Sequence, residues 1–172
     1  MTATARRSRT NPHLLHVGAN EAGRDFAVGD IHGCFGALRQ ALDSIGFVES
    51  RDRLFSVGDL VDRGPESDQV LDWLDRPWFY AICGNHDFMI WRSALGNPYQ
   101  EVNYLDHGGA WLDALDPDRQ QRIGDRLAAL PLAIEVATPD GAVGLVHADC
   151  PYDDWRDMRG QPLSPSAQDC CL

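Results

Sequence analysis

Short apolar runs alternate along this chain with polar turns that open on glycine. Three such runs cover residues 26–28, 54–57 and 79–82, and each is followed at once by a turn rich in Asp, Asn or His. Between the turns, apolar residues recur at helical spacing, so the pattern predicts strand, turn and helix in repeated order. This alternation is typical of an α/β domain whose strands run parallel in one sheet.

The helices are expected in the segments that separate these runs. They are predicted over residues 34–45, from an N-cap at Ser67 to the region before Pro77, over 87–95, and within 99–130. Farther along, Pro139-Asp140-Gly141 separates two apolar runs, residues 132–137 and 142–146, which predicts a hairpin.

The turns after the strands carry oxygen and imidazole donors. They read GDIHG (29–33), GDLVDRG (58–64) and GNHD (84–87), and GLVHAD (144–149) repeats the design. Open α/β sheets gather their ligands at the carboxyl ends of the strands, so these side chains are expected to meet. Such a set of Asp, Asn and His side chains indicates a hydrolytic site that holds two divalent metal ions.

Asp59 is predicted to bridge the two ions, because it follows the second strand and is central in the order of the motifs. Asp30 and His32 can hold one ion from a single loop, and Asn85 and His147 can hold the other. Mixed oxygen and nitrogen ligands suit Mn, with Fe or Zn as alternatives, better than Mg or Ca. The ions would lower the pKa of a bridging water and give a hydroxide for in-line attack on phosphorus.

Three neighbouring residues suggest how a phosphoester is held and cleaved. Arg63 can fork onto phosphate oxygens, the alternative being an ordinary surface arginine. His86 is expected to protonate the leaving alkoxide while Asp62 orients and charges it. The alternative is that His86 is itself a metal ligand, or that it makes a structural hydrogen bond.

Size, charge and cysteine content limit the number of domains, the partners and the compartment expected for this chain. The chain has 172 residues, enough for one domain, and its net charge of -11 argues against a nucleic-acid partner held on a basic face. No stretch approaches the ~20 apolar residues of a membrane span. Five cysteines without a CxxC pair favour free thiols in a reducing cytoplasm. Residues 1–23 are predicted to form a disordered arm, with an organelle transit peptide as the alternative.

The blocks GDIHG, GDLVDRGP and GNHD, in this order, resemble the phosphoprotein phosphatase signature of the metallophosphoesterase superfamily. The surrounding sequence, including PWFYAICGNHDFMI, HGGAW and HADCPYDDW, is similar to bacterial and phage lambda-type serine/threonine protein phosphatases over residues 24–162. The resemblance implies an α/β fold, a calcineurin-like β-sandwich flanked by helices, with a dinuclear Mn-type centre. It implies the same ligands, Asp30, His32, Asp59, Asn85 and His147, and the same roles for His86, Asp62 and Arg63.

The last part of the chain departs from that family. The family supplies a further metal-binding histidine in a later segment, whereas no histidine follows His147 here. A second phosphate-binding arginine has no matched counterpart, and Cys83 stands where lambda-type relatives tend to have arginine. Residues 163–172 are expected to form an irregular tail. The resemblance therefore implies a C-terminally shortened domain with an incomplete second sheet.

Three functions follow from these observations. The first is a cytoplasmic, metal-dependent phosphoester hydrolase of the serine/threonine protein phosphatase type, acting on a phosphoprotein or a small phosphoester. The second is a dinucleoside-tetraphosphate hydrolase, since such enzymes carry an apolar residue at the position of Cys83. The third is a catalytically impaired remnant that lacks the last metal-binding histidine. No nucleic acid and no membrane is expected as a partner.

Overall fold

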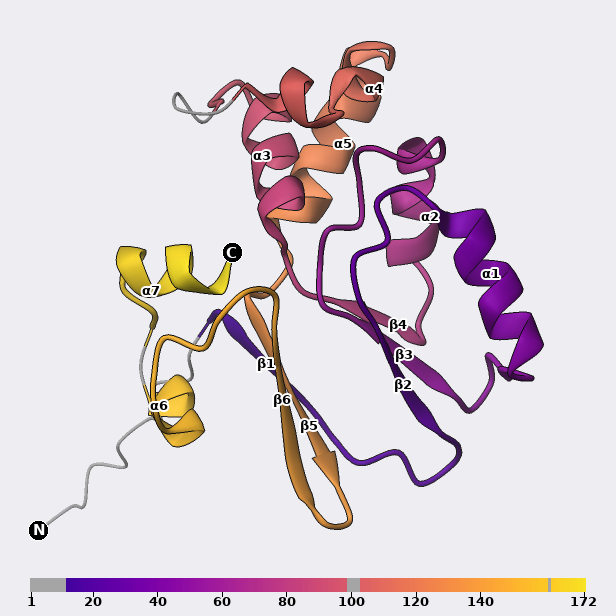
Figure 1. The fold of residues 1–172 in the computed structure, drawn as a ribbon, viewed down its shortest axis with the longest axis vertical. Helices are drawn as coiled ribbons and strands as arrows, with labels where there is room; N and C mark the ends of the chain where they lie inside the picture. Colours follow the sequence, from indigo (N-terminus) through magenta and orange to yellow (C-terminus); the bar gives the residue numbers. More distant parts are fainter. Residues whose placement is uncertain (1–11, 99–102, 161) are drawn as a thin grey trace, which may run out of the picture.

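In the computed structural model, residues 12–98, 103–160 and 162–172 are described, and they form two small sheets with helices around them (Figure 1). One sheet has the strand order β2-β3-β4 and is parallel; the other, β1-β5-β6, is mixed. The strands are β1 (Leu14–Val17), β2 (Asp25–Val28), β3 (Arg53–Ser56), β4 (Phe79–Ala81), β5 (Ala133–Thr138) and β6 (Gly141–Val146). The α-helices are α1 (Phe35–Ser44), α2 (Val70–Leu74), α3 (Asn85–Ala94), α4 (Ala110–Asp113), α5 (Pro117–Ala128), α6 (Trp155–Gly160) and α7 (Pro165–Cys171), and the 3-10 helices are η1 (Ser67–Gln69) and η2 (Tyr104–His107).

This arrangement confirms the predicted α/β class. Helices α1 and α2 flank the parallel sheet, α3 and α5 lie together beyond its β4 edge, and α6 and α7 lie beside the mixed sheet (Figure 1). Both sheets are small, with three strands each among the described residues, and the mixed sheet agrees with the incomplete second sheet that the resemblance implied.

The largest cluster of buried apolar side chains includes residues of the parallel sheet and of the helices that flank it. Leu54 of β3 is 2 % exposed and belongs to a cluster with Phe35 and Leu38 of α1 and Trp73 of α2. The rings of Phe35 and Trp73 stack with centroids 5.2 Å apart. Burying side chains of this size stabilises the fold by roughly 1.5–3 kcal/mol each, so this cluster fixes the strands from which the loops of the site emerge.

The predicted helices are present, with one difference at Ser67. Helix α1 follows the expected spacing and ends near Gly46, which has a φ of 61°. The helix expected to begin at Ser67 is split into η1 and α2, and Ser67 is no N-cap. Its hydroxyl accepts a hydrogen bond from the backbone N–H of Asp62 at 2.9 Å, so its polar group serves the preceding turn instead.

The mixed sheet joins residues from both ends of the described chain. Its hairpin, β5 and β6 joined through Pro139 and Asp140, confirms the predicted turn. The inner face packs on the parallel sheet through an inter-sheet cluster formed by Phe55, Ile82, Ile134 and Val136. Strand β6 is the more exposed partner, and its Val143 is 49 % exposed.

The expectation of a disordered arm over residues 1–23 is wrong where the structure describes that segment. Residues 14–17 form β1, which pairs in parallel with β5 in a register that sets Leu14 opposite Ala133. Leu14 is buried, and His16 contacts Glu135 at 3.2 Å. Four residues carry too little pattern to announce a strand, and the partner that stabilises it lies more than a hundred residues away. Residues 1–11 lie outside the described ranges.

The expectation of an irregular tail over residues 163–172 is also wrong. Helix α7 begins after Ser164, whose hydroxyl accepts the backbone N–H of Ala167 at 3.2 Å. Serine at the N-cap followed by proline at the first helical position is a helix-start signal, which the polar composition of the segment hid. The helix is held in place because the carbonyl of Cys171 accepts the N–H of Ala148 at 3.1 Å.

The helices within the described ranges include none that is both long and apolar enough to cross a membrane. All five cysteines are free thiols, as the sequence predicted.

Candidate metal centre

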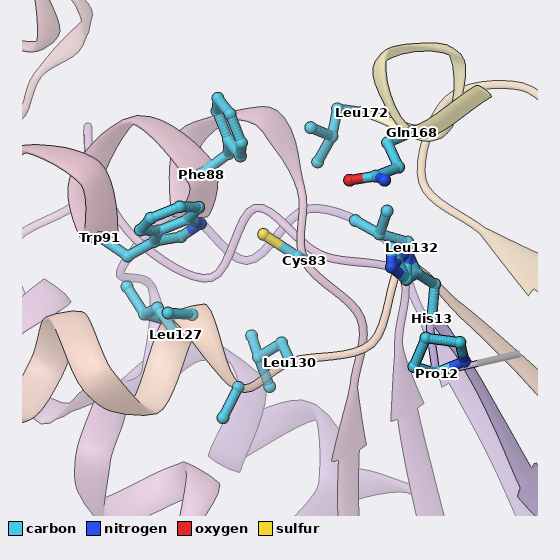
Figure 2. A pocket seen from close by; sticks show the side chains of 12 residues that line it. Pro12, His13, Cys83, Phe88, Trp91, Leu127, Leu130, Leu132, Gln168 and Leu172 are labelled. Carbon is cyan, nitrogen blue, oxygen red and sulfur yellow. The ribbon is translucent and has the colours of Figure 1, made fainter. Parts of the chain in front are cut away.

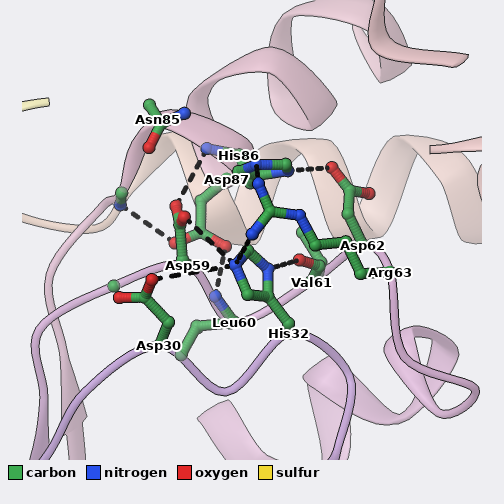
Figure 3. A network of polar contacts seen from close by, with 12 residues as sticks. Asp30, His32, Asp59, Leu60, Val61, Asp62, Arg63, Asn85, His86 and Asp87 are labelled. Carbon is green, nitrogen blue, oxygen red and sulfur yellow. Dashed lines mark hydrogen bonds and ion pairs between the residues drawn. The ribbon is translucent and has the colours of Figure 1, made fainter. Parts of the chain in front are cut away.

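Three of the five predicted metal ligands, His32, His147 and Asp30, lie around a fourth, Asp59, which follows β3. Figure 3 shows Asp59 with Asp30 and His32. The Oδ2 atom of Asp59 is 3.6 Å from Nε2 of His32, and its Oδ1 atom is 3.6 Å from Nε2 of His147. Asp30 approaches the same His32 nitrogen, with its Oδ2 at 3.7 Å. The two oxygens of one buried carboxylate therefore face two separate groups of donors, which is the geometry expected of a bridging ligand.

The fifth predicted ligand, Asn85, completes the second group. Its Oδ1 lies 3.0 Å from Nε2 of His147. Asn85 is the first residue of α3, so the end of β4 and the start of this helix place its amide beside the mixed sheet. All five predicted ligands are thus brought together from four different loops.

Backbone carbonyls orient both of the ligand histidines. Nδ1 of His32 lies 3.0 Å from the carbonyl of Val61, and Nδ1 of His147 lies 2.7 Å from the carbonyl of Val57. A carbonyl only accepts, so each Nδ1 carries the proton and each Nε2 keeps its lone pair. Histidines that bind metal are held in this way by a partner on the other ring nitrogen.

The backbone of the site adopts conformations that side chains ordinarily avoid. His32, Asp59, Asp62 and Arg63 have φ values of 46°, 51°, 72° and 64°, and among the described residues no other non-glycine residue has a positive φ. Left-handed residues of this kind cost on the order of 1–3 kcal/mol each and persist only where the surroundings fix them. Here the carbonyl of Asp59 accepts the backbone N–H of His32 at 2.8 Å, which joins the first two loops.

A glycine allows the third loop to approach the bridging carboxylate. A Cβ atom at Gly84 would lie 2.3 Å from Oδ1 of Asp59, so no other residue fits there without displacement. Two residues later, the backbone N–H of His86 donates to the same Asp59 oxygen at 2.9 Å. The glycine that opens GNHD is therefore needed for the contact between two loops of the site.

Asp87 connects these loops, a role that the sequence did not predict. Its side chain is fully buried and accepts the N–H of Leu60 at 2.9 Å and the N–H of Gly84 at 3.0 Å. Burial, with added repulsion from Asp59, raises its pKa to about 8, although the two N–H donors act in the opposite direction. The available signal was an acidic residue at the third helical position after Gly84, which is typical of a capping box.

Asp62, Arg63 and His86 form a second group beside the ligands (Figure 3). Nδ1 of His86 lies 2.8 Å from Oδ2 of Asp62, and both side chains are buried. The Arg63 guanidinium reaches Nε2 of His32 at 2.7 Å and Nε2 of His86 at 2.9 Å. Arg63 is an exposed residue whose guanidinium lies in the site, and its role as a phosphate ligand stays a prediction. A metal ion held by His32 would compete with it for the same nitrogen.

The segment HGGAW (107–111), which the resemblance includes, also reaches this group, although no role was predicted for Trp111. The indole Nε1 of Trp111 donates to Oδ1 of Asp62 at 2.7 Å, and the rings of His107 and His86 lie 5.9 Å apart. The available signal was the glycine pair, because glycines mark places where one backbone approaches another.

The side chain of Cys83 faces a cavity whose lining includes none of the candidate ligands. Its side chain is 3 % exposed and lines a cavity of about 310 Å³ together with Phe88, Trp91, Leu127 and Leu172 (Figure 2). Burial raises the pKa of the thiol well above its ordinary value, so it stays protonated and offers no cationic contact to a phosphate.

The residues present fit a pair of divalent ions. Two groups of donor atoms, His32–Asp59–His86 and Asp30–Asp59–His147, each lie within 4.8 Å and share the Asp59 carboxylate. The carboxylates of Asp30 and Asp59 supply negative charge, and the imidazoles supply neutral nitrogen donors, a mixture that suits transition metals. His86 occurs in one of the groups, so its alternative role as a ligand stays open.

Comparison with known sequences supports the same chemistry. Residues 26–165 match the family described as calcineurin-like phosphoesterase. The chain is 37 % identical over 136 residues to serine/threonine-protein phosphatase 2 of Escherichia coli, covering 76 % of this chain and 60 % of that protein. It is 34 % identical over 128 residues to a symmetrical bis(5'-nucleosyl)-tetraphosphatase of Methylococcus capsulatus, covering 73 % of this chain and 43 % of that protein. The chain thus spans 60 % and 43 % of the lengths of these two curated relatives, less than two thirds of either.

Solved structures show the same fold. A crystal structure described as a candidate diadenosine tetraphosphatase superposes with a TM-score of 0.66 at 27 % identity, covering 92 % of this chain and 62 % of that one. A serine/threonine phosphatase from Saccharomyces cerevisiae superposes with a TM-score of 0.60 at 20 % identity, covering 94 % of this chain and 52 % of that one.

Proposed function

Since this chain belongs to the calcineurin-like phosphoesterase family, we propose that it is a metal-dependent phosphoester hydrolase of the serine/threonine protein phosphatase type. The observation that carries the proposal is the Asp59 carboxylate, whose two oxygens face His32 and His147 at 3.6 Å each. One carboxylate between two donor groups is what a two-metal hydrolase requires.

Two divalent ions are proposed as cofactors. Asp30, His32 and Asp59 would hold one ion, and Asp59, Asn85 and His147 the other. When bound, such a pair supplies Lewis acidity and lowers the pKa of water, so that a nucleophile for in-line attack on phosphorus exists at neutral pH. Manganese is proposed first because the donors mix oxygen and nitrogen, with Fe or Zn as alternatives.

Arg63 is proposed to bind the phosphate and His86 to protonate the leaving oxygen. The guanidinium offers a planar fork of donors, which matches two oxygens of a phosphoryl group. His86 is supported as the acid because Asp62 holds its Nδ1 at 2.8 Å, which leaves Nε2 to exchange the proton. In this role Arg63 turns away from Nε2 of both His86 and His32 and toward the substrate.

A phosphoprotein or a small phosphoester is the proposed substrate class. This chain covers 60 % of the bacterial protein phosphatase named above at 37 % identity. It covers 43 % of the tetraphosphatase at 34 % identity. The second candidate function, hydrolysis of a dinucleoside tetraphosphate, is favoured by the structural likeness to a candidate diadenosine tetraphosphatase at 27 % identity. The expected cytoplasmic location stays a prediction.

The testing experiment is Mn-dependent hydrolysis of p-nitrophenyl phosphate by the purified chain, beside Asp59→Asn. Loss of the bridging charge is expected to lower kcat by about 100-fold or more while the variant stays folded by circular dichroism. Product analysis then separates the substrate classes: inorganic phosphate from a phosphopeptide supports the first, and ADP from diadenosine tetraphosphate supports the second. A folded wild-type chain with no metal-dependent activity would instead favour the catalytically impaired remnant.

A further inference from the structure

Asp62 is clamped at both of its carboxylate oxygens. Oδ2 lies 2.8 Å from Nδ1 of His86, and Oδ1 accepts the indole N–H of Trp111 at 2.7 Å. Its backbone N–H donates to Ser67 at 2.9 Å. Asp62 has no exposed surface, so water cannot replace any of these partners. A buried carboxylate oxygen that loses its donor carries the full penalty of desolvation.

Trp111 is held against Asp62 by the structure around it. Its neighbour Leu112 is 2 % exposed and packs in the main core cluster, which fixes α4. Asp113, the last residue of α4, accepts the hydroxyl of Tyr104 at 2.5 Å. The indole therefore approaches the carboxylate from a packed helix rather than from a loose side chain.

Of the two glycines that precede this helix, Gly108 lets the segment approach the site. Gly108 has a φ of 94°, and a Cβ atom there would lie 2.7 Å from the backbone nitrogen of Arg63. Any other residue at this position would push the segment away from the loop that carries Asp62 and Arg63. The close approach thus serves the contact between Trp111 and Asp62.

We propose that Trp111 is a positioning residue for proton transfer: its indole fixes the Asp62 carboxylate in the one orientation that keeps Nδ1 of His86 bonded. With Oδ1 satisfied by the indole, the carboxylate cannot rotate, and the imidazole is held with Nε2 directed at the leaving oxygen. This inference rests on the proposed function of His86 as general acid. It predicts that Trp111 acts on the departure of the leaving group and leaves the metal ligands unaffected.

The experiment compares Trp111→Phe with the matched control Trp155→Phe. Trp155 is the second tryptophan whose indole donates to a carboxylate, Oε2 of Glu135 at 2.6 Å, and it lies in α6 beside the mixed sheet. Both changes remove one indole–carboxylate hydrogen bond and keep an aromatic ring. Each protein, loaded with manganese, is assayed on p-nitrophenyl phosphate, whose leaving group departs without a proton, and on phenyl phosphate, whose leaving group needs one.

For Trp111→Phe, we expect kcat on phenyl phosphate to fall by about tenfold or more, since positioned general acids contribute about 10²–10⁴-fold. The fall on p-nitrophenyl phosphate should be under about threefold, because that substrate needs little help from an acid. Trp155→Phe should change both substrates by the same factor. An equal loss on both substrates in Trp111→Phe, or no loss on either, would overturn the proposal.

A second measurement needs no turnover. Long-range ¹H–¹⁵N spectra of the full chain report the protonated Nδ1 of His86, and in Trp111→Phe this resonance should shift or broaden while Trp155→Phe leaves it in place. An unchanged resonance in Trp111→Phe would contradict the positioning role. If the wild-type chain hydrolyses neither ester, the proposed function fails, and the spectra still decide whether Trp111 orients His86.

Discussion

The two sheets contribute to the site in unequal ways. The parallel sheet delivers three loops that hydrogen-bond to one another, through the carbonyl of Asp59 and the buried carboxylate of Asp87. The mixed sheet delivers only His147, from the end of the exposed strand β6. This histidine reaches the parallel sheet through the carbonyl of Val57 at 2.7 Å.

The difference indicates how each candidate ion would be bound. Donors in the first group are fixed by strained, mutually bonded loops, so their geometry exists before any ion arrives. The second group depends on how firmly a three-stranded sheet holds one histidine against Val57. The rigidity of the second donor group thus depends on the contact between the two sheets. The following variants test this difference between the two groups.

The largest effects are expected from removing one histidine on each side, His32→Ala and His147→Ala. Each loss should lower activity by more than the about 10–100-fold typical of indirect partners of a metal. Calorimetric titration with Mn²⁺ should show one tight site remaining in each variant. His16→Ala, which alters a histidine of β1 bonded to Glu135, is the control and should keep the wild-type stoichiometry. Two tight sites in His147→Ala would show that the mixed sheet is dispensable.

A smaller contrast is expected in stability, between β3 and β6. Leu54→Ala removes a side chain that is 2 % exposed and should lower the free energy of unfolding by about 2–5 kcal/mol. Val143→Ala removes one that is 49 % exposed and should cost no more than about 0.5 kcal/mol. Urea denaturation of both variants measures the difference. Equal losses would mean that β6 is as well packed as β3.

The smallest expected effects are on stability at low pH. They are compared at two carboxylates, Asp52 beside the parallel sheet and Glu135 in the mixed sheet. The hydrogen bond from Arg24 lowers the pKa of Asp52 below its ordinary 3.8. At Glu135 burial acts the other way, but donors including Arg159 and Trp155 lower its pKa below its ordinary 4.5. A depressed folded pKa contributes stability above the ordinary value, and that contribution is lost as the pH falls below it.

Unfolding midpoints in urea, measured from pH 6 to about pH 3, should therefore fall in the wild-type chain. Asp52→Asn and Glu135→Gln should each show a shallower fall, because neither amide titrates. An unchanged slope in either variant would remove that carboxylate from the acid response.

The sequence predicts those parts of the molecule that local pattern determines. Apolar runs followed by glycine and polar donors were enough to predict the strands that precede Asp30, Asp59 and Asn85, and the roles proposed for these residues stay predictions. Strand β1 could not be predicted, because four residues without a repeating pattern become a strand only by pairing with β5. The contact of Trp111 with Asp62 could not be predicted for a related reason. It spans 49 positions and depends on how α4 packs.

The pairing of β1 with β5 has a consequence for the order in which the chain folds. Leu14 leaves the ribosome before its partner Ala133, which emerges 119 residues later. Strands β2, β3 and β4 can pair before β5 is synthesised, because their connections are short by comparison. During this interval β1 has an unpaired edge, which is the kind of segment that binds chaperones or pairs with another nascent chain. Synthesis speed between β4 and β5 therefore sets how long that segment must be protected.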